Sequence, residues 1–362
     1  MSGTRPHVLI MAGGTGGHVF PALAVARELI ARGATVSWLG TAAGIESRLV
    51  PSEGLTLNTI DVAGLRGKRL TTLLAAPAAM SRALWQAAQV LRRERPALVI
   101  GMGGFAAGPG GLMARALGIP MLIHEQNAAA GLTNRVLARL AATVLQAFPE
   151  TFAATRGAET VGNPVRHDIL GLPTPAKRWH DRHGPLRLLV LGGSGGALAI
   201  NERVPQALAT LPAAKRPRVR HQAGRTLEAA QAAYEKHGIE AELTAFIDDM
   251  AEAYGWADAV VCRSGALTVA ELAAAGVGAL LVPYPYAVDD HQRANGRYLV
   301  DAGAARLIDQ AELTPERLAG ELDELGGDRA ALRLRAEAAR SVAWLDSTQR
   351  IADACYRTLE AA

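Results

Sequence analysis

The chain has 362 residues, of which 49% are hydrophobic, 20% charged and 4% aromatic; this excludes a disordered chain and, at this length, favours two domains of about 150 to 200 residues. The net charge of +4 is uneven, because residues 1–163 carry 15 Lys/Arg against 8 Asp/Glu, whereas the remainder carries 23 against 26. The basic first half predicts an anionic surface or partner, either acidic lipid or nucleic acid, with a generic solvated face as the alternative.

Short apolar runs alternate with helical stretches along the first half of the chain. This alternation predicts βαβ units and a parallel sheet. The predicted strands are residues 7–11, 34–39, 55–60, 97–100, 121–124 and 143–145.

The same pattern restarts after a proline-rich, charged stretch at residues 172–185, which predicts a second α/β domain. Its strands are expected at residues 186–191, 219–222, 259–262 and 279–282. Residues 332–359 are expected to be helical with few breaks. This last segment could cap the second domain or return to pack on the first.

Four glycine turns follow predicted strands and precede predicted helices: residues 13–17, residues 101–104 with Gly108, residues 192–196, and Ser264-Gly265-Ala266. A helix N-terminus has unpaired N–H groups and partial positive charge, so a turn without side chains lets a phosphate approach it. One such turn can be purely steric. Four at strand ends favour a phosphate-bearing ligand.

The standard phosphate motifs do not fit these turns. A G-x-G-x-x-G pattern from Gly14 fails at Val19, one from Gly193 fails at Leu198, and no P-loop sequence occurs. Both a dehydrogenase and a P-loop NTPase are therefore disfavoured.

Residues 192–196 also match G-x-S-x-G, the nucleophile elbow of α/β-hydrolases. Ser194 would be the nucleophile and His221 or His291 the base. The motif opens a second domain, however, and leaves the other glycine turns unexplained, so the hydrolase is kept only as an alternative.

Several polar residues stand where a ligand at the strand ends would meet them. His18 closes the first glycine turn, and Glu125 lies in the polar run 124–127 after a predicted strand. Glu271, on the helix after Gly265, could accept two hydrogen bonds from a ribose diol. Each also has an ordinary role, as a structural histidine, a polar loop residue or a dipole-compensating carboxylate.

No metal site or disulfide is predicted. No D-x-D sequence occurs, the adjacent Asp289 and Asp290 suit a helix cap, and Cys262 and Cys355 are far apart without a C-x-x-C motif. No signal sequence and no run of about 18 uncharged apolar residues is found, so neither export nor a membrane span is expected.

Six motifs, in order and spacing, resemble those of the MurG family, the N-acetylglucosaminyltransferases that convert lipid I to lipid II in bacterial peptidoglycan synthesis. The match extends from about Val8 to beyond Asn295. The motifs are residues 13–21, 103–109, 124–127, 162–166, 262–271 and 289–292.

The resemblance implies a GT-B fold, in which two Rossmann-like α/β domains with doubly wound parallel sheets face a cleft. Residues 1–163 would bind the acceptor and the membrane, with helix 343–362 packing back on them, and residues 164–342 would bind UDP-N-acetylglucosamine (UDP-GlcNAc). The implied enzyme is an inverting hexosyltransferase that needs no cofactor. It would transfer N-acetylglucosamine to the C4 hydroxyl of lipid I, giving lipid II. It would work as a peripheral protein at the cytoplasmic face of the cell (inner) membrane. Its partners would include other cell-wall synthesis proteins, and nucleic acid would not be among them.

The resemblance also assigns residues to roles. His18 is the first candidate for the general base and Glu125 the second. Gly14, Gly103 and Gly104 would face the acceptor pyrophosphate. The predicted donor contacts are Thr15, Gly16, Gly17, Asn127, Arg166, Ser194, Ile247, Ala266, Leu267, Thr268, Val269, Ala270, Glu271 and Gln292.

Two positions depart from the family pattern. Phe105 stands where the family often has Tyr, and Gly195 where it often has Gln. Neither position can supply a side-chain hydrogen bond here, so neither is assigned a polar contact.

A candidate membrane-binding segment lies in the middle of the first domain's sequence. Three cations, Arg66, Lys68 and Arg69, precede an apolar helical stretch with Leu70, Leu73, Leu74, Leu84 and Trp85. This combination suits a helix lying on an anionic bilayer, although plain core packing gives the same stripe. The remaining alternatives are a UDP-GlcNAc 2-epimerase, which needs no lipid acceptor, and a sugar-nucleotide sensor without turnover.

Overall fold

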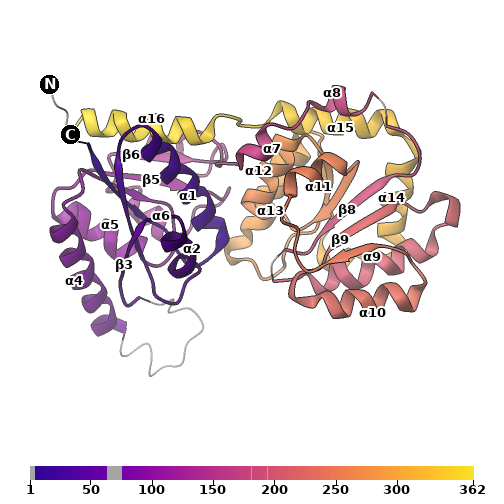
Figure 1. Cartoon of the computed structure of the whole chain (residues 1–362), viewed down its shortest axis with the longest axis horizontal. Coiled ribbons are helices and arrows are strands. Elements are labelled where there is room, and N and C mark those ends of the chain that lie inside the picture. The colour runs from indigo at the N-terminus through magenta and orange to yellow at the C-terminus, as the bar shows by residue number, and fades with distance from the viewer. Residues whose placement is uncertain (1–4, 63–75, 181, 194) are drawn as a thin grey trace. The chain divides into compact units, whose positions relative to one another are not determined.

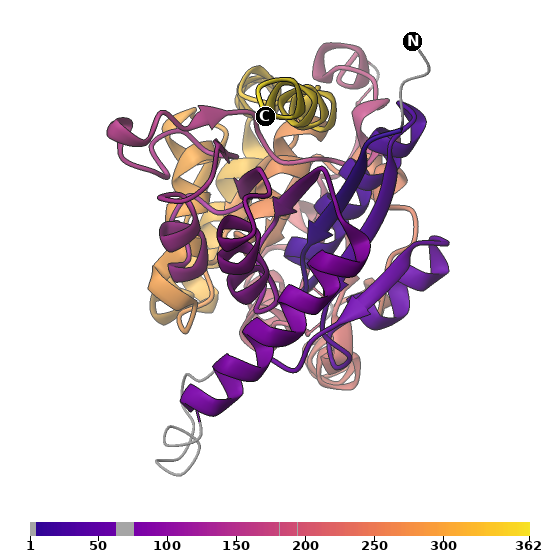
Figure 2. The same ribbon diagram turned by 90° about the vertical axis from the view of Figure 1, so that its left-hand side faces the viewer.

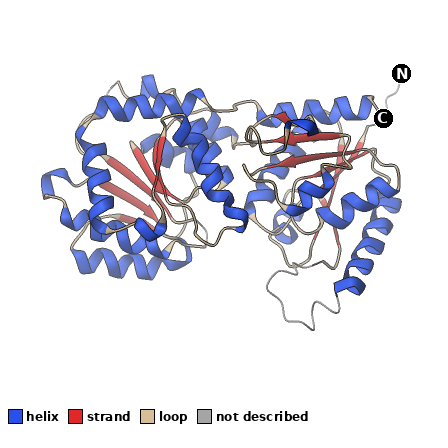
Figure 3. Cartoon of the chain, turned by 180° about the vertical axis from the view of Figure 1, so that it is seen from behind, coloured by secondary structure: helices blue, strands red, loops and turns tan. Residues whose placement is uncertain are grey.

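The structure is a computed structural model that describes residues 5–62, 76–180, 182–193 and 195–362. The chain forms two compact units, the first comprising Met1–Pro164 with Asp346–Ala362 and the second Val165–Leu345 (Figure 1). In each unit, helices cover a parallel sheet (Figure 3).

The sheet of the first unit has seven strands in the order β3-β2-β1-β4-β5-β6-β7, and every pair is parallel. Apolar runs long enough for one strand but too short for a helix explain most of these elements. The strands are β1 (His7–Met11), β2 (Thr35–Gly40), β3 (Thr56–Thr59), β4 (Leu98–Gly101), β5 (Met121–Glu125), β6 (Thr143–Gln146) and β7 (Glu159–Thr160).

The two faces of this sheet bury alternate residues of the same strands, as a period of two requires. Val8 and Ile10 of β1 belong to a core with α1 (Gly16–Ala31) and α16 (Ser347–Glu360). Leu9 and Met11 face the opposite core, which contains residues of α4 (Ala76–Glu94), α5 (Ala107–Ala116) and α6 (Leu132–Leu137). Burial on both faces explains why these strands are continuously apolar. The described residues of this unit also form α2 (Glu46–Ser52).

The C-terminal helix α16 belongs to the first unit, where it packs beside α1. Ile351 and Cys355 are fully buried in the shared core. At its far end, the Thr358 and Thr143 hydroxyls share a hydrogen bond of 2.7 Å, and Arg357 pairs with Glu159 at 2.8 Å.

The second unit has a six-stranded parallel sheet in the order β10-β9-β8-β11-β12-β13. Val190 and Val261 face a core that contains residues of α9 (Leu198–Thr210) and α14 (Pro315–Gly327). The strands are β8 (Arg187–Leu191), β9 (Arg218–Gln222), β10 (Glu242–Thr244), β11 (Ala259–Cys262), β12 (Gly278–Leu281) and β13 (Ala305–Leu307). The helices are α7 (His167–Leu170), α8 (Pro175–Arg178), α9 (Leu198–Thr210), α10 (Leu227–His237), α11 (Met250–Trp256), α12 (Ala266–Ala275), α13 (His291–Asp301), α14 (Pro315–Gly327) and α15 (Arg329–Ser341).

In both sheets the strand order reverses beside the first strand. The chain winds outward from β1 to β3 and then returns to β4, and likewise from β8 to β10 and then to β11. Such a reversal leaves a crevice beyond the carboxyl ends of the central strands, where ligands of open α/β sheets bind. The glycine turns after β1, β4, β8 and β11 lie at these two crevices.

The structure agrees with the expectation for the last segment and adds three strands. Residues 332–359 are helical with one break, at residues 342–346, which separate α15 from α16. The additional strands β7, β10 and β13 have two or three residues each.

The predicted membrane segment is only partly described. Arg66, Lys68, Arg69, Leu70, Leu73 and Leu74 lie outside the described residues, whereas Leu84 and Trp85 lie on α4, the long violet helix in Figure 2. None of the described helices has both the length and the apolar character needed to cross a bilayer.

Candidate active site

A buried carboxylate holds the glycine turn after β1 from behind. Glu46 is fully buried, and its Oε2 accepts a hydrogen bond of 2.9 Å from the Gly14 N–H. Its Oε1 accepts from the N–H and the hydroxyl of Thr41 at 2.9 and 2.7 Å. Any Cβ at Gly13 would come within 2.3 Å of Glu46 Oε1, so the carboxylate fills the space that a side chain would need.

The hydrogen bonds to Glu46 also decide its charge. Burial by itself would raise the pKa of Glu46, but the donors from Gly14 and Thr41 outweigh that effect and hold the pKa below its ordinary value. Glu46 is therefore an anion at neutral pH.

The second glycine turn, after β4, packs directly on the first. Gly104 has φ +89°, and a Cβ there would lie 2.4 Å from the Gly13 carbonyl oxygen. Gly103 has φ +92°, and a Cβ there would lie 2.6 Å from His18 Nδ1. Both positions combine a left-handed backbone with a close approach, so both require glycine. Phe105, which follows them, is exposed.

His18 is the third residue of α1, and its ring begins a chain of hydrogen bonds into the protein. Its Nδ1 lies 3.0 Å from Gln126 Oε1. Gln126 Nε2 lies 3.2 Å from His124 Nδ1, and His124 Nε2 lies 2.9 Å from the Gly162 carbonyl oxygen. Burial lowers the pKa of His124 to about 4, against smaller opposing contributions from Gly162 and Glu125, so the His124 ring is neutral at physiological pH.

Glu125, the other candidate base, uses both carboxylate oxygens to organise the loop after β5. Its Oε1 accepts hydrogen bonds from the backbone N–H and the side-chain amide of Asn127, at 3.0 and 3.2 Å. Its Oε2 accepts from the N–H of Gly131 and the side-chain amide of Asn134, at 3.2 and 2.9 Å. This side chain is buried, and its geometry is that of a loop brace.

The N-terminus of α1 supplies donors beside His18. Thr15 is the N-cap residue and makes no side-chain cap hydrogen bond. Gly16 and Gly17 follow as the first helical residues, whose N–H groups have no intrahelical acceptor. The Gly14 N–H, in contrast, already donates to Glu46.

In the second unit, an amide side chain holds the turn after β8. Gln222 Oε1 accepts from the Gly193 N–H at 2.9 Å, and Gln222 Nε2 donates to the carbonyls of Gly193 and Ala245 at 3.2 and 2.8 Å. Gly224, with φ +66°, covers the turn so closely that a Cβ would lie 2.2 Å from the Gly193 carbonyl oxygen. Ser194 lies outside the described residues.

The helix α12 begins at the crevice of the second sheet, directly after β11. Gly265 is its N-cap and offers no side chain, so the N–H groups of Ala266, Leu267 and Thr268 lack intrahelical acceptors. The N–H of Val269 already donates to the Gly265 carbonyl at 2.9 Å, and its side chain is fully buried in the core. Ala270, one residue further on, is half-buried.

Glu271 lies on α12 beside Arg166 and Tyr254. The fully buried Tyr254 donates its hydroxyl to Glu271 Oε2 at 3.1 Å. Arg166 Nε lies 3.9 Å from Glu271 Oε1 and 4.0 Å from an oxygen of Asp168. Burial raises the pKa of Glu271, while Arg166 and the Tyr254 hydroxyl oppose the shift. This carboxylate is thus only partly solvated and has a cation beside it.

Two further predicted donor contacts, one in a loop and one at a helix start, belong to the second unit. Ile247 is half-buried between β10 and α11. Gln292 lies in the first turn of α13, where its Oε1 accepts from the Tyr284 N–H at 2.9 Å. Its side chain therefore shapes the loop after β12.

The predicted site residues are divided between the two units. Thr15, Gly16, Gly17, His18 and Asn127 belong to the first unit, together with the acceptor-side glycines. The remaining described donor contacts belong to the second unit. Across the described ranges, no three His, Cys, Asp or Glu side chains lie together in a group that could hold a metal ion.

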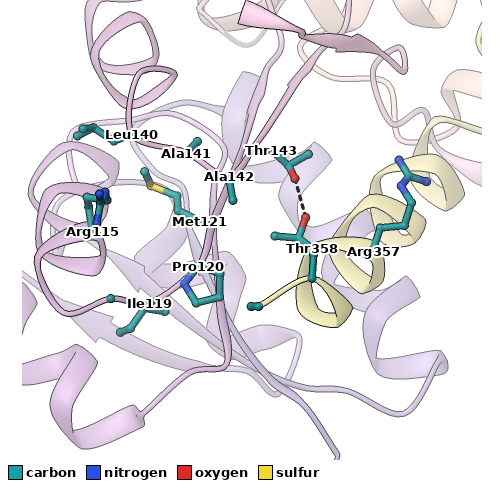
Figure 4. Close-up of a pocket in the computed structure, with 13 residues that line it drawn as sticks. Arg115, Ile119, Pro120, Met121, Leu140, Ala141, Ala142, Thr143, Arg357 and Thr358 are labelled. Carbon is teal, nitrogen blue, oxygen red and sulfur yellow. Dashed lines mark hydrogen bonds between the residues drawn. The ribbon is translucent and has the colours of Figure 1, made fainter.

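A separate hollow of 470 Å³ lies at the amino ends of β5 and β6, away from both glycine turns (Figure 4). Arg115, Met121 and Leu140 line one side, and Arg357 and Thr358 of α16 line the other. None of the predicted site residues lines it.

Three functional side chains were not singled out from the sequence. Glu46 holds the turn after β1, Gln222 holds the turn after β8, and Tyr254 holds Glu271. Glu46 lies 32 residues from Gly14, and Gln222 lies 29 residues from Gly193. The only available signal was the position of Gln222 at the end of a predicted strand.

Comparison with known proteins agrees with this arrangement. The glycosyltransferase family 28 N-terminal domain matches residues 8–146, and the glycosyltransferase family 28 C-terminal domain matches residues 187–353. Among curated proteins, UDP-N-acetylglucosamine–N-acetylmuramyl-(pentapeptide) pyrophosphoryl-undecaprenol N-acetylglucosamine transferases are similar over nearly the whole chain. That of Chromohalobacter salexigens is 58% identical, covering 96% of both chains. That of Marinobacter nauticus is 54% identical, covering 99% of this chain and 98% of the relative.

Solved structures show the same fold. The crystal structure of Acinetobacter baumannii MurG superposes with a TM-score of 0.86 at 43% identity, covering 98% of this chain and 100% of that one. The calicheamicin glycosyltransferase CalG4 superposes with a TM-score of 0.70 at 19% identity, covering 99% of each chain, and so shares the fold alone. With two parallel-sheet units and both family domains in order, the chain belongs to glycosyltransferase family 28 and has the GT-B fold.

Proposed function

We propose that this protein transfers N-acetylglucosamine from UDP-GlcNAc to the C4 hydroxyl of the muramyl sugar of lipid I, giving lipid II for peptidoglycan synthesis. The observation that carries this proposal is the 54–58% identity, over at least 96% of the chain, to transferases named for that reaction. The crevice geometry of both units supports it.

The second unit binds the donor. Glu271 accepts hydrogen bonds from the ribose hydroxyls, a role that suits a partly solvated carboxylate held by the Tyr254 hydroxyl. Arg166 and the Ile247 backbone recognise the uracil. Ser194 and the α12 N-terminus, Ala266 to Thr268, contact the diphosphate, because the first N–H groups of a helix are natural ligands of phosphate oxygens.

The first unit supplies the base and receives the acceptor. His18 removes the proton from the C4 hydroxyl as its oxygen attacks the anomeric carbon. The bond from that carbon to UDP breaks at the same time, and the electron pair moves to the β-phosphate oxygen. The α12 N-terminus and Arg166 stabilise the negative charge that develops on the leaving UDP.

Because lipid I is a membrane lipid, the protein must bind a membrane surface, and α4 has side chains suited to that contact. Met80 is 38% exposed and Trp85 61% exposed, whereas the small residues Ala83 and Ala87 are buried against the unit. Arg82 is exposed beside them. Aromatic and aliphatic side chains next to cations suit the interface of an anionic bilayer. The protein is therefore a peripheral component of the inner face of the cytoplasmic membrane.

Transfer of labelled N-acetylglucosamine to a lipid-linked muramyl acceptor tests the reaction directly. Labelled lipid II is the expected product, and it should depend on both substrates. An epimerase would convert UDP-GlcNAc without any acceptor. A hydrolase would be labelled covalently at Ser194 by a serine-directed phosphonate, whereas the transferase should bind UDP and form no adduct.

Sedimentation with vesicles tests the membrane surface separately. We expect the protein to bind vesicles rich in anionic phospholipid, to lose affinity as salt rises, and to be weakened by Arg82→Glu and Trp85→Gln. The matched control is Arg48→Glu, which makes the same charge change at an exposed position on α2. Equal loss in the control would reduce the effect to net charge and remove α4 from the proposal.

A further inference from the structure

The hydrogen-bonded chain from His18 into the protein has a fixed direction, and its inner end sets that direction. The Gly162 carbonyl oxygen can only accept, so His124 Nε2, 2.9 Å away, must carry a proton. His124 is fully buried, and burial keeps its ring neutral. A neutral imidazole has one N–H, so His124 Nδ1 is a bare acceptor.

The orientation of the Gln126 amide follows from that acceptor. Gln126 Nε2 lies 3.2 Å from His124 Nδ1 and 3.3 Å from the His124 carbonyl oxygen. Both neighbours are acceptors, so the NH₂ group of Gln126 must face them. Reversing the amide would place its oxygen against two acceptors in a buried site, which is unfavourable. Gln126 Oε1 is therefore turned toward His18.

The last link is His18 itself. Its Nδ1 lies 3.0 Å from Gln126 Oε1, an acceptor, so Nδ1 carries the proton whenever the ring is neutral. Which ring nitrogen is protonated is set by the hydrogen bond that the other nitrogen or its neighbour makes. The second glycine turn leaves room for this arrangement, because Gly103 has no Cβ that would meet Nδ1.

We infer that the His124–Gln126 pair holds His18 in the Nδ1–H tautomer and so leaves Nε2 as the bare nitrogen that takes the proton of the acceptor hydroxyl. This inference rests on the proposed function for its last step only. Gln126 is then a positioning residue, which acts on the reaction through His18. His124 acts one link further back, as the group that orients Gln126.

The neighbouring Glu125 shows why the chain matters for the choice of base. Both of its oxygens are occupied by four donors from its own loop. A base needs a lone pair directed at the substrate in addition to such bonds. The chain through Gln126 leaves His18 with one, because it uses Nδ1 and not Nε2.

Nitrogen NMR of the whole protein labelled with ¹⁵N-histidine tests the tautomer without any activity measurement. At a pH where His18 is neutral, we expect its Nδ1 to show the shift of a protonated ring nitrogen and its Nε2 that of a bare one. His18→Ala identifies the signals. A wild-type His18 that is protonated on Nε2 overturns the inference.

Gln126→Leu tests the positioning role, because it removes both links of the amide while keeping the side chain's approximate size. We expect His18 to populate both tautomers and kcat to fall about 10- to 100-fold, since a wrongly protonated catalytic histidine can cost up to about 10⁴. The KM for UDP-GlcNAc should change less than about twofold. An unchanged tautomer ratio in Gln126→Leu overturns the inference.

The matched control is Gln146→Leu. Gln146 is also a buried glutamine of the first unit, with hydrogen bonds to Thr160 and the Phe152 N–H rather than to a histidine. The Gln146→Leu substitution should lower the stability of the protein. It should leave the tautomer of His18, kcat and the KM for UDP-GlcNAc unchanged. Gln126→Met serves where Gln126→Leu does not fold. Full transfer by His18→Ala would remove the proposed catalytic role of His18 and still leave the tautomer assignment standing.

Discussion

The turns after β1 and β8 share one backbone plan and differ in the side chain that braces it. In each unit the first strand leads into a glycine turn that is covered by a second left-handed glycine, Gly104 or Gly224. A Cβ added at Gly104 or Gly224 would lie only 2.4 or 2.2 Å from a carbonyl oxygen of the turn. The first turn is braced by the anion Glu46. The second is braced by the neutral amide of Gln222, which both accepts from and donates to Gly193.

This difference in charge suits the two turns to different ligands. An anion directly behind the first turn consumes the Gly14 N–H and lowers the local potential, which makes the turn a poorer site for a highly charged phosphate. The neutral side chain of Gln222 behind the turn after β8 does not lower the local potential in this way. The proposed base, His18, follows the turn after β1, so we propose proton transfer at that turn and diphosphate binding at the turn after β8.

The largest expected effect comes from removing the imidazole of His18, the proposed base beside the turn after β1. His18→Ala should lower kcat about 10²- to 10⁴-fold, the usual contribution of a general base, with little change in the KM for UDP-GlcNAc. Steady-state transfer to lipid I measures both constants.

Glu125→Gln is the comparison for that variant. It places an amide NH₂ among donors that now bond a carboxylate, so it should lower the melting temperature while reducing kcat less than His18→Ala does. A larger fall in kcat than in His18→Ala, at unchanged melting temperature, would make Glu125 the base instead.

A smaller effect is expected when the charge behind the first turn is removed. Glu46→Gln leaves at least one of its buried donors without an acceptor and should cost about 1 to 3 kcal/mol of stability at pH 7. Because the folded-state pKa of Glu46 is lowered, the contribution is present above the ordinary glutamate pKa and is lost as the pH falls through the lowered value.

The stability difference between wild type and Glu46→Gln should therefore be largest near neutral pH and shrink in acid. Urea unfolding at several pH values measures the difference, and amide exchange at Gly14 localises it. A difference that grows toward low pH would contradict the assignment of Glu46 as a buried anion.

The contrast between the two turns also shows how far the sequence could predict this molecule. Strands β1, β4, β8 and β11 were predicted within a residue or so, because buried parallel strands are continuous apolar runs. The edge strands β7 and β10 were missed because they are short and polar. The break between α15 and α16 contains no Gly or Pro to indicate it.

The candidate site was predicted where its residues adjoin strand ends, and missed where they do not. Glu125 is the last residue of β5, and His18 and Gly265 lie at the turns that follow β1 and β11, so the position alone drew attention to them. Glu46 lies on a different helix, and nothing in its local sequence indicates that its side chain reaches Gly14. The direction of the His18 hydrogen-bond chain likewise depends on the Gly162 carbonyl, which no residue pattern indicates.

The smallest expected effect comes from placing a carboxylate behind the turn after β8, like the one that Glu46 places behind the turn after β1. Gln222→Glu makes this change, and the new negative charge should repel the diphosphate of UDP. We expect the dissociation constant of UDP to rise about tenfold, which corresponds to about 1.4 kcal/mol. Calorimetric titration with uridine is the control, because the nucleoside lacks the diphosphate that the new charge repels. If uridine and UDP lose equal affinity, the variant has distorted the turn through the displaced bonds to the Gly193 and Ala245 carbonyls. A selective loss of UDP affinity would instead place the diphosphate at this turn.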